Sequence, residues 1–421
     1  MKAKVNITFF LLIIFLVVIC LFGACNDEIF YYISKEFEIK DPIIKGSPTN
    51  LVYLKSEQKI YVAAGKKLYN YNKDDGWPEK PLNIMNDKKE MNIGQLAATD
   101  NDLYALCYED KSGEITQKIL KRNADVWEEI PKITGDYTIP QAIYAANNTL
   151  YIGAQKRNTN DYAVHVLNSS GVLQEDNIPK RDPAADKREP VTLLNGACYN
   201  GTNVFLCTTS GIFIDGAVIK YTLDDGKSIK GANHNFSGII TLPDNTVAAI
   251  TREGRLYKVE VSRLIDDPDE EGEKIDVPVV VYITRIPGGR YTTGAIATWK
   301  DSKDPEKNLL LVGRTDYEYT TTTGHTYGYM ELVLSAQGAF ELEKEDYGFK
   351  EPGEIIDNTT VGDRHRYSAS MGAIPINSFI QLPVEVDPEM PIFASTQKEG
   401  VWSCRERGTE DEKTREWNAE D

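Results

Sequence analysis

The sequence has few of the side chains from which metal and catalytic sites are built. Its four histidines are scattered, and none has the short spacing to another histidine or to a glutamate that metal sites use. The sequence also lacks a Gly-x-Ser-x-Gly segment, the pattern that would indicate an activated serine. The acidic segment 267–272 begins like a calcium loop, but Pro278 stands where such a loop needs a bidentate glutamate. We therefore predict no metal, no cofactor and no catalytic residue.

Cysteine is also scarce, with six in 421 residues. The four that follow the first 25 residues are Cys107, Cys198, Cys207 and Cys404. Their spacing matches no zinc-binding pattern. Cys198 and Cys207 flank a predicted turn at 201–203, so a disulfide across a hairpin is one alternative. The other, which we favour, is that the four cysteines are buried free thiols.

Positive charge is in short supply. The chain has 47 lysines and arginines against 64 aspartates and glutamates, and its formal net charge is −17. This balance argues against nucleic acid as a partner and against binding an anionic membrane through a basic patch. The acidity itself is explained most simply by solubility.

Long apolar runs are missing except at the N-terminus. Residues 7–24 are apolar apart from one threonine, and two lysines precede them. The run ends in Gly23-Ala24-Cys25 and resembles a bacterial lipoprotein signal, in which the cysteine is acylated and becomes the new N-terminus. We predict three segments: a signal peptide at 1–24, acylated Cys25 with a tether or extra strand at 25–48, and the main domain at 49–421.

This N-terminus predicts export and attachment to a bacterial membrane by lipid, at the outer membrane or cell surface rather than the inner membrane. The alternative is an uncleaved transmembrane anchor, because eighteen largely apolar residues just span a bilayer. Both interpretations place the rest of the chain outside the cytoplasm.

A small-residue pattern recurs along the main domain. Its seven copies are Asn50-Leu51-Val52, Gln95-Leu96-Ala97, Gln141-Ala142-Ile143, Gly196-Ala197-Cys198, Gly238-Ile239-Ile240, Gly294-Ala295-Ile296 and Gly372-Ala373-Ile374. A second strand pattern follows each copy, at Ile60-Tyr61, Leu103-Tyr104, Leu150-Tyr151, Val204-Phe205, Thr246-Val247, Leu309-Leu310 and Ile392-Phe393. Further strands follow, and several of them open with glycine.

Seven units of four short strands predict an all-β chain with a single seven-bladed β-propeller, although six or eight blades also fit. The innermost strand of each blade crowds around a narrow channel, which favours glycine and alanine there. The start of the chain, together with Gly400–Arg405 and Glu416-Trp417-Asn418, resembles bacterial β-propeller lipoproteins, in particular treponemal ones. That resemblance implies location and fold. It carries no catalytic residue, because such families are largely uncharacterised.

One group of residues suggests a ligand pocket. An aromatic or histidine residue precedes several of the small-residue copies, twice with an arginine before it. In a propeller these positions enter the innermost strands and meet at the channel mouth. The predicted pocket contains Tyr137, His234, Phe236, Arg290, Tyr291, Arg366 and Tyr367. The alternative is that these residues pack between blades.

A tyrosine-rich hairpin is the second candidate, as an interaction surface. Its residues are Tyr317, Tyr319, His325, Tyr327 and Tyr329. Cross-strand tyrosine pairs also occur without any partner. Overall we expect a module that binds a small anionic or glycan ligand, or an envelope protein. The alternatives are a glycan hydrolase or lyase acting at the channel mouth, and a scaffold subunit of an envelope complex.

Overall fold

The computed structural model describes residues 43–420 with gaps at 79, 87–88, 112–113, 125, 134–135, 169–170, 172, 176–192, 225–226, 231–233, 268–271, 287–291, 301–307, 315–328, 341–373 and 408–413. The chain divides into two compact units, and the described residues belong to the unit Pro42–Glu420. The predicted signal peptide and Cys25 lie outside them. No helix among the described residues is long and apolar enough to cross a membrane.

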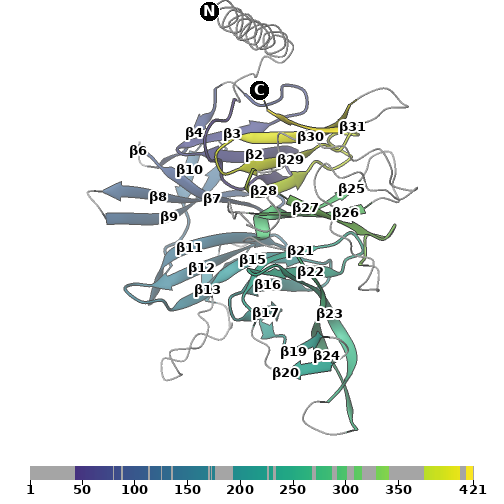
Figure 1. Cartoon of the computed structure of the whole chain (residues 1–421). Helices are drawn as coiled ribbons and strands as arrows, with labels where there is room; N and C mark the ends of the chain where they lie inside the picture. The colour runs from purple at the N-terminus through teal and green to yellow at the C-terminus, as the bar shows by residue number, and fades with distance from the viewer. Residues whose placement is uncertain are drawn as a thin grey trace, which may run out of the picture. The chain divides into compact units, whose positions relative to one another are not determined.

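The described strands form the blades of a β-propeller, which confirms the predicted all-β fold and its seven repeats (Figure 1). Blade 1 contains β1 (Val52–Leu54), β2 (Lys59–Ala64), β3 (Lys67–Tyr71) and β4 (Leu82–Asn83). Blade 2 contains β7 (Asn92–Ala98), β8 (Leu103–Lys111), β9 (Glu114–Asn123) and β10 (Val126–Glu129). Blade 3 contains β11 (Tyr137–Ala146), β12 (Thr149–Lys156), β13 (Tyr162–Leu167) and β14 (Leu173–Glu175). A small hairpin between blades 1 and 2 contains β5 (Met85–Asn86) and β6 (Lys89–Glu90).

The remaining blades follow in chain order. Blade 4 contains β15 (Leu194–Tyr199), β16 (Val204–Thr208), β17 (Gly211–Ile214) and β18 (Ala217–Val218). Blade 5 contains β21 (Phe236–Thr241), β22 (Val247–Thr251), β23 (Arg255–Asp266) and β24 (Lys274–Arg285). Blade 6 has a short 3-10 turn, η1 (Thr293–Ala295), and within the described residues the strands β25 (Ile296–Lys300), β26 (Asn308–Gly313) and β27 (Tyr329–Leu334). Blade 7 contains β28 (Ile376–Gln381), β29 (Ile392–Thr396), β30 (Val401–Arg407) and β31 (Thr414–Ala419).

The small-residue copies in blades 1 to 6 lie at or beside the innermost strands, as predicted, and the structure shows why small residues are needed. A Cβ atom added to Gly238 would lie 2.6 Å from Cδ1 of Ile296, on the next blade. One added to Gly294 would lie 2.7 Å from the backbone oxygen of Asn377. The seventh predicted copy, Gly372-Ala373-Ile374, is wrong, because the innermost strand of blade 7 is β28, which begins only at Ile376. Gly372 and Ala373 lie outside the described residues.

Polar side chains join neighbouring innermost strands at one recurring position. The side-chain amide of Asn50 bonds both backbone groups of Leu96 in blade 2, at 2.8 and 2.9 Å. Gln95 does the same to Ile143 in blade 3, at 2.7 and 3.0 Å. These contacts satisfy backbone groups that the strand ladders leave open, so they fix one blade against the next.

At the same position of blade 4 stands Gly196, which has no side chain to make this contact. Thr293 of η1 takes its place. Its hydroxyl donates to the backbone oxygen of Asn195 at 2.6 Å and accepts from the N–H of Ile239 at 3.3 Å. A Cβ atom on Gly196 would collide with this hydroxyl. One residue of blade 6 therefore ties blade 4 to blade 5 at the centre of the ring.

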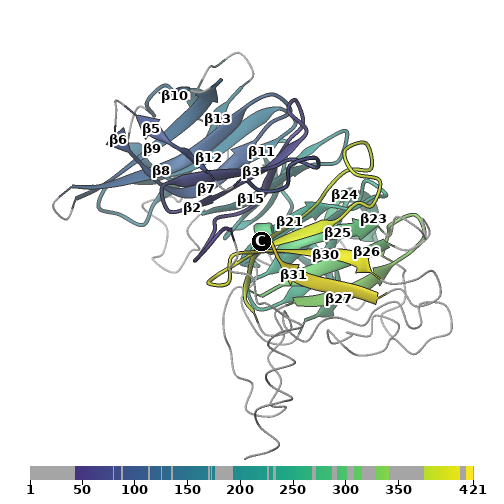
Figure 2. The same ribbon diagram turned by 90° about the horizontal axis from the view of Figure 1, so that it is seen from above.

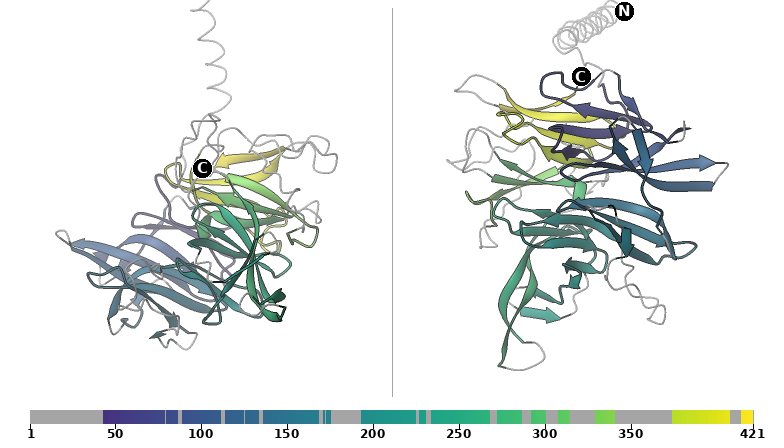
Figure 3. Two further views of the ribbon diagram at one scale, coloured as in Figure 1. Left: turned by 60° about the horizontal axis from the view of Figure 1, so that its bottom comes forward. Right: turned by 180° about the vertical axis from the view of Figure 1, so that it is seen from behind.

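The ring closes where blade 7 meets blade 1. The N–H of Leu51 donates to the hydroxyl of Ser378 at 2.7 Å, which corresponds to one of the two bonds that join blade 1 to blade 2 and blade 2 to blade 3. The segment that precedes β1 also binds blade 7, because the N–H of Ile43 donates to the oxygen of Glu420 at 3.2 Å. Figures 1 and 3 show the purple and yellow strands side by side at this seam.

Two extensions depart from the simple repeat. A hairpin of β19 (Tyr221–Asp224) and β20 (Lys227–Lys230) pairs in parallel with β24 and widens blade 5 to six strands. The strands β8 and β9 also run on beyond the rest of blade 2, as Figures 1 and 2 show. Neither feature was predicted from the sequence.

The cysteines agree with the favoured prediction. None of the four forms a disulfide, three of them are buried, and Cys198 is half-buried. Across the β15–β16 hairpin Cys198 faces Phe205, whereas Cys207 faces Gly196, so the register does not pair the two thiols. Burial raises the pKa of the Cys198 thiol to about 12 and keeps it protonated.

Candidate functional site

The structure describes three residues of the predicted channel mouth, since Arg290, Tyr291, Arg366 and Tyr367 lie outside the described residues. Tyr137 opens β11 and Phe236 opens β21, so both positions enter innermost strands as the repeat predicted. The convergence of all seven side chains stays a prediction.

In blade 5 the predicted residues belong to an aromatic cluster. Phe236 is buried between blades 4 and 5, and the half-buried ring of His234 lies 4.9 Å from the ring of Tyr257. Burial, and then the charge of Arg255, lower the pKa of His234 below its usual 6.5, so the imidazole is neutral at pH 7. Phe236 and Tyr257 pack between sheets, and His234 covers them.

The predicted tyrosine hairpin is described only at Tyr329, since Tyr317, Tyr319, His325 and Tyr327 lie outside the described residues. Tyr329 is 1% exposed and its hydroxyl accepts a 2.8 Å hydrogen bond from the indole of Trp417. This tyrosine therefore joins blade 6 to blade 7 and presents no exposed surface.

A concave feature in the described part of the chain lies between blades 2 and 3. It is a groove of about 510 Å³ beside the first half of β9. Four segments line it: Ile115–Ile119 of β9, Glu129–Ile133 from the last residue of β10 onward, Thr138–Pro140 of β11, and Arg157-Asn158 after β12. Tyr137 directly precedes the third of these, so the predicted mouth position in blade 3 borders the groove.

The groove combines apolar walls with positive charge. Ile115 is 65% exposed, and Ile133 and Ile139 are half-buried. The lining has three cations, Lys118, Lys132 and Arg157, against one carboxylate, that of Glu129. Lys118 pairs with Glu129 at 2.8 Å. In a chain with a net charge of −17, this local surplus of positive charge sets the groove apart.

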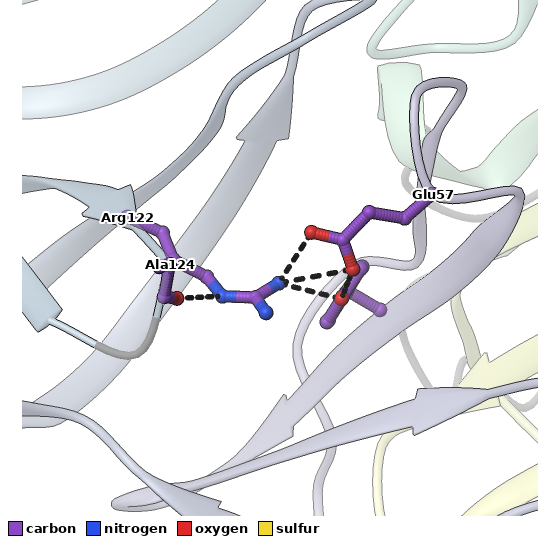
Figure 4. Close-up of polar contacts among 4 residues, drawn as sticks. Glu57, Arg122 and Ala124 are labelled. Atoms are coloured by element: carbon purple, nitrogen blue, oxygen red, sulfur yellow. Dashed lines mark hydrogen bonds and ion pairs between the residues drawn. The ribbon is translucent and has the colours of Figure 1, made fainter.

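At the other end of β9 a polar network joins blade 2 to blade 1 (Figure 4). Nη1 of Arg122 donates to Glu57 at 3.1 Å and to the Tyr61 hydroxyl at 2.5 Å, and Nε donates to the oxygen of Ala124 at 2.8 Å. The Tyr61 hydroxyl also bonds Glu57. Burial, and then this bond, raise the pKa of Tyr61. Nη1 and Nε of Arg122, the Glu57 carboxylate and the Tyr61 hydroxyl all have partners inside the network, so it serves as a clamp between blades.

Neither the groove nor this clamp was predicted from the sequence. The isoleucines of 115–139 and a strand pattern longer than a blade needs are the sequence signals for the groove. For the described residues, no group of three or more histidine, cysteine or acidic side chains is arranged to hold a metal ion.

Comparison with known proteins supports the fold. No family model matches the chain, and no curated protein matches it in sequence. Among solved structures it is similar to the GH74 xyloglucanase of Xanthomonas campestris, with a TM-score of 0.52 and 12% identity over 91% of this chain and 55% of that one. It is also similar to YCF48 bound to D1 peptide (TM-score 0.43, 10% identity, 86% and 93% covered). A third similar structure is the β-propeller domain of Cps50 from Myceliophteria thermophila, with a TM-score of 0.48 and 9% identity over 86% of this chain and 97% of that one. At these identities the likeness extends to the β-propeller fold alone.

Proposed function

We propose that this chain is an exported lipoprotein, acylated at Cys25, whose propeller binds a ligand or protein partner at the cell envelope. The groove between blades 2 and 3 is the proposed binding site. The observation that carries the proposal is its lining, in which isoleucine and proline side chains lie beside polar and positively charged ones. Binding sites combine apolar contact with polar groups that fix the orientation of the ligand.

The charge of the lining indicates the kind of ligand. Lys132 and Arg157 are exposed, and neither forms an ion pair with a carboxylate in the described ranges. An anionic ligand would gain from both cations, whereas the acidic remainder of the surface would repel it elsewhere. The proposed ligand therefore carries carboxylates or other anionic groups beside an apolar part.

A binding screen on the soluble chain from Glu28 onward tests this function. The panel contains peptides, anionic small molecules and envelope glycans, and Ile115→Glu serves as the groove variant. We expect at least one ligand whose affinity falls about tenfold in this variant, because the change removes apolar contact and adds a negative charge.

Val126→Glu is the matched control. Val126 is 60% exposed, lies on β10 of the same blade, and does not line the groove. A ligand that loses affinity equally in both variants would refute the assignment to the groove. Cleavage of a glycan in the panel, without loss in Ile115→Glu, would favour the alternative of a glycan hydrolase or lyase at the channel mouth.

A further inference from the structure

One edge of β9 is only partly paired. Along its β8 side the ladder runs from Glu114 to Lys121. Along its other side β10 pairs only with Leu120–Asn123. One more bond follows, from the N–H of Ile130 to the oxygen of Ile119 at 3.1 Å, and then comes Pro131, which has no N–H to donate. Within the described residues, the ladder on this side of β9 ends there.

The direction of the free groups follows from the ladder. In an antiparallel strand the N–H and C=O of one residue point to the same side, and the side alternates along the strand. Since the oxygen of Ile119 faces β10, the backbone groups of Gln117 and Ile115 face the same way. These are two donors and two acceptors, spread over about 7 Å of strand, with no described strand opposite them.

This edge forms one wall of the groove, because Ile115, Gln117 and Ile119 all line it. An exposed strand edge of this kind is a template for pairing with a further strand. The lining also contains the half-buried side chains of Ile133 and Ile139 and the exposed cations Lys132 and Arg157. An extended acidic peptide can pair with the backbone groups, pack its apolar side chains against the isoleucines and bind the cations with its carboxylates.

We propose that the groove binds an extended peptide segment of a partner protein as an added strand on β9, with apolar side chains alternating with carboxylates. This inference rests on the proposed function of the groove as a binding site. Main-chain hydrogen bonds to Ile115 and Gln117 hold the peptide, and Lys132 and Arg157 select for its acidic residues. A second copy of this chain suits the edge less well, because both copies carry the same net charge of −17.

The probe is a library of twelve-residue peptides in which valine, isoleucine or threonine alternates with glutamate. Matched libraries carry glutamine or lysine in place of glutamate. Binding to the full chain in detergent micelles is measured by fluorescence anisotropy. We expect the glutamate library to bind about tenfold more tightly than the lysine library, and Lys132→Glu with Arg157→Glu to reverse that order.

Hydrogen exchange tests the pairing itself. The bound peptide is expected to slow exchange at the amides of Ile115 and Gln117, but not at Thr116, whose N–H already faces β8. N-methylation of alternate peptide residues separates the two edges of the added strand. One methylation register is expected to abolish binding, and the other to preserve it.

Binding of the glutamate library with unchanged exchange at Ile115 and Gln117 would overturn the added strand. So would slowed exchange at these amides on self-association of the chain without peptide. If no peptide library binds while another ligand still depends on Ile115, the inference fails and the proposed function stands. If Ile115→Glu affects no ligand at all, the proposed function fails.

Discussion

Thr293 is the residue whose role can be tested most directly, because one hydroxyl serves two blades. It donates to the oxygen of Asn195 and accepts from the N–H of Ile239, and Ile239 is 2% exposed. Thr293→Val keeps the shape of the side chain and removes both bonds. The two backbone groups then lose their partner at the centre of the ring, where Gly196 offers no side chain to replace it.

Leaving a buried donor or acceptor unpaired costs about 1–3 kcal/mol. Thr293 itself is half-buried, so we take about 2 kcal/mol for the pair of bonds together. With an unfolding entropy of about 2.1 cal/mol/K per residue, a unit of this length is expected to lose roughly 2–3 °C in Tm. Thermal unfolding followed by circular dichroism measures this shift.

Two matched variants isolate the hydroxyl. Thr293→Ser keeps both bonds and is expected to restore most of the Tm. Thr202→Val makes the same chemical change at an exposed turn and is expected to leave the Tm within measurement error. If the Tm of Thr293→Val equals that of the wild type, the hydrogen bonds from blade 6 do not stabilise the ring. Equal losses in the valine and serine variants would assign the effect to packing.

Three further predictions address other parts of the chain. Cys25→Ser is expected to abolish acylation and signal cleavage, and a variant that is processed and partitions into detergent like wild type would refute the lipoprotein proposal. Ala295→Leu overpacks a fully buried position and is expected to cost about 1–3 kcal/mol by chemical denaturation, whereas Val126→Ala, on an exposed strand, is expected to cost far less. Because the pKa of His234 is lowered in the folded chain, the unfolded chain takes up a proton there first as the pH falls. The contribution of His234 to stability is therefore complete above about pH 6.5 and is lost as the pH drops toward the folded pKa. His234→Gln is expected to flatten part of that decline, and an unchanged dependence of stability on pH would contradict this prediction.

The repeat was readable from the sequence because crowding at the channel imposes it on each innermost strand. Glycine or alanine is forced wherever a neighbouring blade approaches closely, as at Gly238 and Gly294. In blade 7 the predicted copy lies several residues too early in the chain. The position that glycine occupies in blades 4 and 5 is taken there by Ser378, which bonds Leu51 instead of leaving space. Asn50 and Gln95 make the same kind of contact in blades 1 and 2, but serine begins none of the other copies, so the pattern did not include it.

The groove was less predictable because it depends on where a strand stops. Nothing in Val126–Glu129 alone shows that β10 is only four residues long, although its partner β9 has ten. Pro131 marks the departure in hindsight. The hairpin β19–β20 was not predicted for a related reason. Its pairing with β24 joins segments almost sixty residues apart, such as Tyr221 and Val279, and has no local signal in the sequence.

The seam between blades 1 and 7 also decides how the chain responds to force. A chain held by its N-terminus transmits any pull to Ile43 first, then to the bond between Gly46 and Gly400, and then to the contact of Pro48 with Asn377. The load meets these bonds in chain order, one at a time, and only afterwards reaches the core of blade 1. In a chain pulled at its N-terminus, residues 43–48 are therefore expected to detach in small steps before any blade unfolds.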